Sequence, residues 1–282
     1  MRFLILLAGL PLVASERTVD PTFLHRYVPD VHEQKSDIAT ATCHYKAIFG
    51  AGDSQSRVPR GVARFGEVRL DAGGSCEAVA YPAEEQAYVM LDGGGSFDYA
   101  GEKLTLRKHD FLYVPPGVRH AMASAAGARF VVMGFKVPAG SHVTLPSKPL
   151  VANIDDVKWE TVSGHPDSVL YQLLMGDKKS KRDKIAAGDV LTSLFIMEFA
   201  PGGTNFPHHH DQDEEIYLVL DGSGDMVAGG GTDGVEGRHP ARAGDAYFFR
   251  LNCTVGFYSS RQGPKARILA VRSRYPFKAE VE

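Results

Sequence analysis

The stretch GGTNFPHHHDQDEEIYLVLDG, residues 202–222, decides how this chain of 282 residues is interpreted. Residues two apart on a β-strand face the same side, so His208 and His210 can present two imidazoles to one point. His209 should face the opposite way. Glu215 opens an apolar run and can add a carboxylate from the next strand. The pattern predicts a metal centre with His208, His210 and Glu215 as ligands.

The fixed positions of this stretch, G-x5-H-x-H-x4-E-x6-G, resemble the first signature motif of the cupin superfamily. The resemblance implies a jelly-roll β-barrel that holds one divalent metal ion per chain, Fe, Mn, Zn or Ni, beside a small-molecule site. The alternative is a solvated histidine run or the remnant of a tag. The apolar context and the downstream Glu215 argue against it, because a tag needs neither.

The second cupin motif, G-x5-P-x-G-x2-H, is incomplete after this stretch. Gly244 opens it, but Arg250, Asn252 and Val255 stand where the pattern has proline, glycine and histidine. Valine cannot bind a metal, so two histidines and one carboxylate remain, a ligand set that leaves positions open for substrate and dioxygen. The alternatives are weak metal binding, or a substitute ligand from His209, His239, Asn252, Cys253 or Tyr258.

The same pattern occurs earlier in the chain. Residues 71–93 align without a gap to residues 200–222, with Val79, Tyr81 and Gln86 in place of the three ligands. Residues 109–120 keep the second motif nearly whole and end in His120, which we interpret as a structural, hydrogen-bonding residue because no second imidazole faces it. We therefore predict an all-β chain of two tandem cupin (jelly-roll) barrels. The first covers residues 16–145 with a degenerate metal motif, and the second covers residues 146–282 and binds the metal.

Short apolar runs bounded by Gly, Asp and Pro predict the main strands of each barrel. In the second barrel they are Val169–Met175, Val190–Phe199, Ile216–Leu220, Ala246–Phe249 and Arg267–Val271. Their counterparts in the first are Tyr45–Phe49, Val62–Leu70, Ala87–Leu91, Phe111–Val114 and Arg129–Phe135.

Composition narrows the classes of partner. Lys and Arg number 31 against 34 Asp and Glu, so no overall field attracts nucleic acid or a membrane surface, and no nucleic-acid-binding motif is present. Thirty Gly and 16 Pro are typical of a turn-rich β protein. We expect a small-molecule ligand as partner, no nucleic acid and no membrane span; a homodimer is compatible with the sequence.

The N-terminal segment carries a targeting signal on our interpretation. Residues 1–15 place one positive charge before an apolar run that ends in small residues, which predicts a secretory signal cleaved after Ser15 and a secreted or periplasmic protein. The alternative is a cytoplasmic chain that begins with a buried strand or helix. The chain has three cysteines, Cys43, Cys76 and Cys253, so at least one stays outside a disulfide unless two chains are linked. This odd number favours a reducing compartment.

Two loops distinguish the repeats. Residues 177–184 concentrate positive charge before the metal-bearing strands; they either guide an anionic substrate or are only solvated. Residues 229–240 are an insertion that we expect to form a hairpin tip, from which His239 could reach the metal if the loop folds inward.

The resemblance leaves the chemistry open, because cupins include dioxygenases, isomerases, decarboxylases, aminohydrolases, storage proteins and ligand-binding modules. No catalytic residue can be assigned. The favoured hypothesis is a metal-dependent enzyme of dioxygenase, isomerase or aminohydrolase type that acts on a small organic acid or sugar derivative in the second barrel. The alternative is a non-catalytic metal- or sugar-binding module. Candidate substrate contacts, each with barrel packing as the alternative role, are Tyr247, Arg250, Tyr258 and His239.

Overall fold

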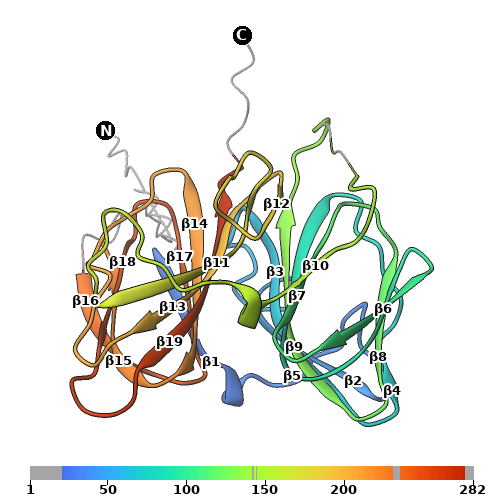
Figure 1. The fold of residues 1–282 in the computed structure, drawn as a ribbon, viewed down its shortest axis with the longest axis horizontal. Coiled ribbons are helices and arrows are strands. Elements are labelled where there is room, and N and C mark those ends of the chain that lie inside the picture. The colour runs from blue at the N-terminus through green and yellow to red at the C-terminus, as the bar shows by residue number, and fades with distance from the viewer. Residues whose placement is uncertain (1–20, 142, 144, 231–235, 277–282) are drawn as a thin grey trace, which may run out of the picture.

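The computed structural model describes residues 21–141, 143, 145–230 and 236–276, which form two β-barrels side by side (Figure 1). The predicted signal at residues 1–15 lies outside the described residues. Each of the ten predicted strand runs falls on an observed strand, although several observed strands extend further at one or both ends and Val190 lies one residue ahead of its strand. No helix in the described part of the chain is long and apolar enough to cross a bilayer. The prediction of an all-β fold of two tandem jelly-roll barrels is confirmed.

The elements of the first repeat follow one another along the chain from residue 23 to residue 136. They are β1 (Phe23–Tyr27), the 3-10 helix η1 (Val28–Asp30), β2 (Cys43–Gly50), β3 (Val62–Leu70), β4 (Gly74–Ser75), β5 (Glu84–Tyr99), β6 (Glu102–Arg107), β7 (Asp110–Val114), β8 (His120–Ser124) and β9 (Ala128–Lys136).

The elements of the second repeat run from residue 150 to residue 274 and, as in the first, begin with a strand followed by a 3-10 helix. They are β10 (Leu150–Asn153), the 3-10 helix η2 (Ile154–Asp156), β11 (Val169–Asp177), β12 (Ile185–Gly188), β13 (Leu191–Phe199), β14 (Asp213–Asp221), β15 (Ser223–Gly229), β16 (Glu236–Arg242), β17 (Asp245–Phe249), β18 (Thr254–Ser259) and β19 (Ala266–Arg274). The predicted insertion at residues 229–240 covers the end of β15 and much of β16, and part of its tip lies outside the described residues.

The two barrels exchange their leading strands. β1 pairs antiparallel with β17, so it extends the seven-stranded sheet β1-β17-β14-β19-β13-β11-β12 of the second barrel. β10 pairs antiparallel with β7 in the sheet of the first barrel. Each repeat therefore completes the sheet of the other barrel. The boundary at residue 145 divides the two sequence repeats and stays a prediction.

Successive side chains of a strand point to opposite faces of the sheet, so each strand contributes to two different cores. In β14, Ile216 and Leu218 belong to the apolar cluster between the barrels, whereas Tyr217 and Val219 belong to the cluster inside the second barrel. Both faces of the strand are thus buried, which explains its nearly continuous apolar sequence. The same alternation turns Glu215 towards the barrel interior, on the side of Tyr217.

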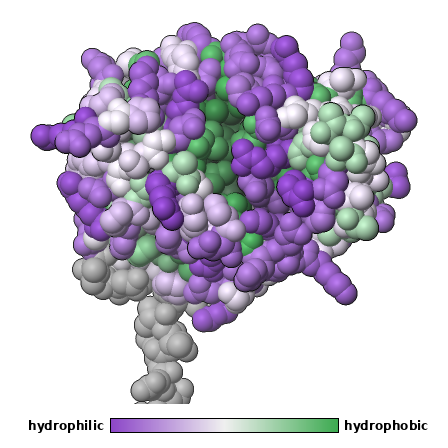
Figure 2. Space-filling model, turned by 90° about the horizontal axis from the view of Figure 1, so that it is seen from below, coloured by the Kyte–Doolittle hydropathy of each residue, from purple (hydrophilic) through white to green (hydrophobic). Residues whose placement is uncertain are grey.

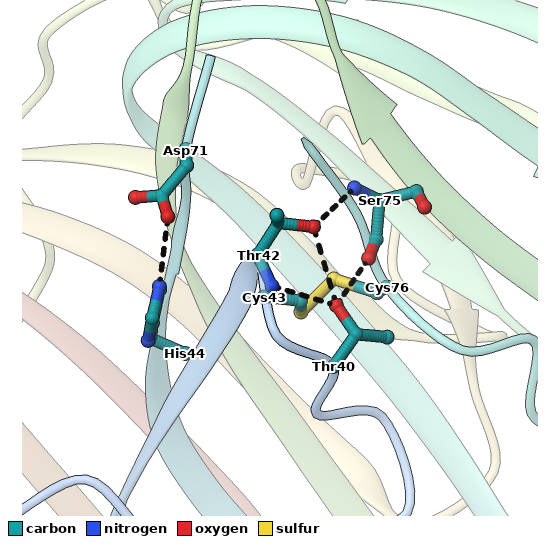
Figure 3. The surroundings of a disulfide bond; sticks show 7 residues. All are labelled: Thr40, Thr42, Cys43, His44, Asp71, Ser75 and Cys76. Carbon is teal, nitrogen blue, oxygen red and sulfur yellow. Dashed lines mark hydrogen bonds and ion pairs between the residues drawn. A yellow bond between two sulfur atoms is a disulfide. The ribbon is translucent and has the colours of Figure 1, made fainter. Parts of the chain in front are cut away.

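A disulfide joins Cys43 at the start of β2 to Cys76, just beyond β4 (Figure 3). The surrounding polar groups tie the same segments together, because the Thr40 hydroxyl donates to the Ser75 carbonyl (2.7 Å) and the Ser75 amide donates to the Thr42 hydroxyl (3.2 Å). Cys253 is buried in the second barrel and takes no part in this bond. The odd cysteine count thus contains one intrachain disulfide, a pairing that the sequence alone did not determine.

Candidate metal centre

His208 lies in an extended segment ahead of β14, opposite the position where the second motif lacks its histidine. His208 and Val255 form an isolated antiparallel bridge, with both backbone hydrogen bonds made (2.9 and 2.8 Å). Val79 and His120 form the same bridge in the first barrel. This symmetry supports the alignment of the two repeats and places Val255 at the position of the missing histidine.

The histidines do not lie on a regular strand, which corrects the local geometry assumed from the sequence. Phe206 has a left-handed backbone (φ 53°) and Pro207 has no N–H to donate, so a ladder cannot continue through this segment. The two imidazoles nevertheless converge, with ring centroids of His208 and His210 5.0 Å apart. His209 between them is exposed, as expected.

The predicted ligands form a compact group. One ligand atom from each of His208, His210 and Glu215 lies within 4.8 Å of the other two. Nε2 of His210 is 3.2 Å from Oε2 of Glu215, and apart from this contact both buried atoms have no hydrogen-bond partner among the described residues. Nδ1 of His208 is 2.8 Å from the carbonyl of Phe206, which assigns the proton to Nδ1 and leaves the lone pair on Nε2.

The protonation of these groups suits metal binding, which requires a neutral imidazole and an ionised carboxylate. Burial lowers the pKa of His208 below 6.5. Burial alone would raise the pKa of Glu215, but the neighbouring His210 and the positive charge of Arg272 outweigh it, so this pKa lies below its usual value. The orphaned buried atoms and the donor set together fit a divalent cation.

The ligand group opens into a cavity of about 90 Å³ inside the second barrel. Apart from the three ligands, its wall combines apolar and polar side chains: Val162, His165, Tyr171, Leu173, Arg182, Ser193, Phe195, Met197, Asn205, Tyr217 and Arg272. The Tyr171 hydroxyl, Ser193 Oγ and Arg272 Nε are buried there without a hydrogen-bond partner among the described residues. Native interiors rarely leave such groups unpaired, so ordered water or a bound ligand would satisfy these atoms.

None of the four substrate contacts suggested by the sequence lines this cavity. Tyr247 stacks on His25 (centroids 4.5 Å apart), and His239 packs against Phe23 (5.0 Å). Tyr258 alternates with the inward-facing residues of β18 and lies under the guanidinium of Arg238 (4.0 Å). The side chain of Arg250, which follows β17, approaches the carbonyl of Pro21 (3.4 Å). These four residues are close to the motif in sequence, but none of them reaches the cavity, although Tyr247 faces the interior of the second barrel.

The structure instead brings residues from distant segments to the cavity. Arg272 comes from β19, and in the sheet its backbone lies opposite Glu215 of β14 on one side and Ser193 of β13 on the other. Arg182 comes from the basic loop at residues 177–184, and His165 from the loop ahead of β11. His165 was not singled out from the sequence, because no motif or periodicity marks a lone histidine in a loop.

The first barrel has replaced the metal centre by hydrogen bonds and ion pairs. His120 uses both ring nitrogens, Nε2 to the Tyr88 hydroxyl (2.6 Å) and Nδ1 to the Val118 carbonyl (2.8 Å), which supports its structural interpretation. The guanidinium of Arg64 pairs with Glu84 (2.9 Å) and lies 3.9 Å from the ring centroid of Tyr81. His120, Arg64 and Glu84 therefore have partners in this barrel, whereas the buried Tyr45 hydroxyl has no hydrogen-bond partner among the described residues.

A larger cavity of about 710 Å³ lies between the barrels and has a hydrophobic floor, seen as the hollow in Figure 2. Its floor includes Val89 and Leu218, which occupy aligned positions of the two repeats. The arginines at its rim are neutralised locally, Arg129 by Glu67 (3.2 Å) and Arg267 by Glu198 (2.7 Å). Among the described residues it carries neither a metal-ligand group nor a buried polar side-chain atom left without a hydrogen-bond partner.

Two tandem jelly-roll barrels with a His-x-His and Glu group inside the second define a two-domain cupin. The family model for the cupin domain matches residues 66–134 and 195–271, more than half of the chain and one match in each barrel. The chain therefore belongs to the cupin family. No curated protein matches it in sequence.

Solved structures of bicupins share the fold along nearly the whole chain. A protein described as glyoxylate-induced, from Pseudomonas aeruginosa, has a TM-score of 0.70 at 16% identity, covering 97% of this chain and 96% of its own. Protein Ylba from E. coli has a TM-score of 0.66 at 15% identity, covering 93% and 95%. Oxalate decarboxylase from Lactobacillus farciminis, in a formate complex, has a TM-score of 0.65 at 14% identity, covering 93% and 89%. At these identities the likeness shows the shared fold alone.

Proposed function

We propose that this bicupin is an enzyme with one divalent metal per chain, held by His208, His210 and Glu215, and that the second-barrel cavity is its active site for a small organic acid. The observation that carries the proposal is the gathering of unpaired buried polar atoms around one small cavity. Leaving a buried donor or acceptor unpaired costs about 1–3 kcal/mol. Unpaired atoms of Tyr171, Ser193 and Arg272 face this space beside the contact between His210 and Glu215 (3.2 Å). A metal together with the oxygen atoms of a ligand would satisfy them.

The charge of the wall favours an acid over a neutral sugar. Arg272 lines the cavity and its Nε has no hydrogen-bond partner among the described residues, whereas Arg182 at the same wall lies 3.7 Å from the carboxylate of Asp183. A guanidinium presents several donors in a fixed plane, which suits a carboxylate. The volume of about 90 Å³ favours a molecule of few non-hydrogen atoms.

Each group has a distinct role in this proposal. A bound metal would act as a Lewis acid or activate dioxygen at its open positions. Arg272 would orient the substrate carboxylate, and the Tyr171 hydroxyl would donate a hydrogen bond to it. The apolar wall, with Phe195 and Met197, would exclude water. The Bacillus subtilis oxalate decarboxylase, which shares the fold, has Mn(II) centres, so Mn²⁺ is the first metal to test.

The test starts from metal analysis of protein purified without a tag, followed by assays of oxygen uptake, decarboxylation, isomerisation and hydrolysis on small acids and uronates. Glu215→Ala should abolish turnover far more than it weakens substrate binding, because the metal centre is then lost. Arg272→Met should leave the metal content unchanged and raise KM for the acid. If a small molecule binds equally well without metal and no assay detects turnover, the protein is a non-catalytic binding module instead.

We further propose that the protein works in an oxidising compartment, secreted or periplasmic. The Cys43–Cys76 disulfide supports this, because such bonds persist mainly outside the reducing cytosol. Fractionation of the native host, with mass spectrometry of the mature N-terminus, tests the compartment and the predicted cleavage after Ser15 together.

A further inference from the structure

The histidine missing from the second motif leaves one question about the proposed metal centre, which is whether another side chain has taken its place. Of the substitutes suggested by the sequence, His209 is exposed, and His239, Asn252, Cys253 and Tyr258 are not part of the cavity wall. His165 is part of it. Its ring lies edge-on to that of His208 with centroids 5.5 Å apart, close to the 5.0 Å between His208 and His210.

The hydrogen bonding of His165 resembles that of a ligand histidine. Nδ1 of His165 is 3.0 Å from the carbonyl of Asn205, as Nδ1 of His208 is 2.8 Å from the carbonyl of Phe206. A metal-bound histidine usually donates its other ring N–H to such an acceptor, which fixes the tautomer and the ring orientation. Nε2 of His165 makes no hydrogen bond within the described residues. With the proton on Nδ1, the lone pair of Nε2 is therefore free to bind a metal.

The loop that carries His165 is built to reach the barrel mouth. It turns at Gly164 (φ 87°), and a bridge between Glu160 and Tyr171 anchors it to β11. The corresponding loop of the first barrel is anchored by a bridge between Gln34 and Tyr45. That loop delivers Asp37 to Arg64 at the degenerate site (3.2 Å). In both barrels this loop therefore supplies a side chain that completes the polar group at the mouth.

We propose that His165 is the fourth protein ligand of the metal and replaces the histidine that the second motif lacks at Val255. This inference rests on the metal centre proposed above. His165 lies outside the compact group of three, so its ring must move inward when the metal binds. Four protein ligands would close a tetrahedral zinc shell but leave open positions on a six-coordinate ion, so the assignment favours Mn²⁺ or Fe²⁺ for an enzyme.

The affinity of the full chain for Mn²⁺, measured by calorimetry, tests the assignment. His165→Ala should weaken binding by at least about tenfold, since even an outer partner of a ligand costs that much. His209→Ala, which removes an exposed imidazole from the ligand segment, should leave the affinity unchanged. Val255→His introduced into His165→Ala should restore the affinity, because it returns the imidazole to the motif position.

Pulsed EPR of the Mn²⁺-loaded protein gives a second measure, the number of coordinated imidazoles. We expect three in the wild type and two in His165→Ala. His165→Gln, compared with the wild type by circular dichroism and thermal unfolding without metal, separates a loss of ligation from a loss of folding. Tight Mn²⁺ binding with two imidazoles and no effect of His165→Ala would overturn this inference and leave the proposed function standing. No metal binding by the wild type would overturn both.

Discussion

Glu85 of β5 and Glu214 of β14 occupy aligned positions of the two repeats, and each buries its carboxylate in the opposite barrel. Glu85 accepts hydrogen bonds from the backbone amides of Asp189 and Val190 (2.8 Å each) and from that of Leu191. Glu214 accepts from the amides of residues 60, 61 and 62, at 2.8, 2.7 and 3.2 Å. This reciprocal arrangement joins the barrels. Each carboxylate accepts hydrogen bonds from backbone N–H groups at the start of a strand in the other barrel, and these groups would otherwise be buried in the interface without an acceptor.

Glu85→Gln and Glu214→Gln should each lower the free energy of unfolding by about 2–4 kcal/mol. The new amide group turns a donor towards backbone donors, so buried N–H groups lose their acceptor. Denaturant unfolding of both variants measures the effect, with Glu102→Gln as an exposed control that should stay within about 0.5 kcal/mol of wild type. Very different costs for the two substitutions would contradict the equivalence of the two positions.

The metal stoichiometry follows from the asymmetry of the barrels. Only the second barrel groups three metal-ligating side chains among the described residues, so we expect about one tightly bound metal per chain. The double variant His208→Ala/His210→Ala should hold none, as measured by elemental analysis. The single variant His120→Ala serves as the first-barrel control and should keep its metal. Two tightly held metals per chain in the wild type would refute the assignment.

Val255→His should tighten metal binding, because the backbone bridge to His208 places the new imidazole on the ligand side. It should also cost about 1–3 kcal/mol of stability in the metal-free protein, since Val255 is buried and its pocket is filled. Calorimetric titration with Mn²⁺ and thermal unfolding measure the two effects. Val255→Leu controls for the added volume and should lower the stability without raising the affinity.

The surface histidine His44 provides a test of electrostatics away from the metal centre. Its hydrogen bond to Asp71 (3.0 Å), supported by Glu33 (2.9 Å), raises the pKa of His44 above 6.5. A raised folded-state pKa means that this contribution to stability is full below about pH 6.5 and is lost as the pH rises through the folded value. NMR titration should therefore give a value above 6.5 in the wild type and a lower one in Asp71→Asn. An unchanged value in the variant would show that the Asp71 contact has no effect.

Reduction of the Cys43–Cys76 disulfide should destabilise the protein by about 3–4 kcal/mol, because the unfolded chain regains the freedom of a loop that spans a sequence separation of 33 residues. Unfolding with and without a reductant measures the loss. The double variant Cys43→Ser/Cys76→Ser should unfold like the reduced protein and no longer respond to reductant. If reductant shifted the unfolding midpoint of this variant too, a disulfide between the Cys253 residues of two chains would have to be responsible.

The sequence by itself determined the fold class and identified the three side chains that converge at the candidate metal centre. Spacing within one short segment was sufficient to bring His208, His210 and Glu215 together, because the two histidines lie close in sequence on an extended segment and Glu215 follows at the start of the next strand, even though the histidines themselves are not on a regular strand. The second motif likewise placed Val255 at the position of the missing histidine, which its backbone bridge to His208 supports. These are local or repeated patterns, which a single chain displays without its tertiary structure.

The tertiary structure decided which other residues meet the metal centre. His165 and Arg272 come from a loop and a strand far from the motif, and only the closure of the barrel brings them to the cavity. The exchange of β1 and β10 between barrels and the Cys43–Cys76 pairing depend in the same way on contacts across long stretches of chain. The residues chosen for nearness in sequence, such as Tyr258, point elsewhere. Strand alternation fixes the side on which a residue lies, whereas the neighbours on that side are set by how distant strands pack.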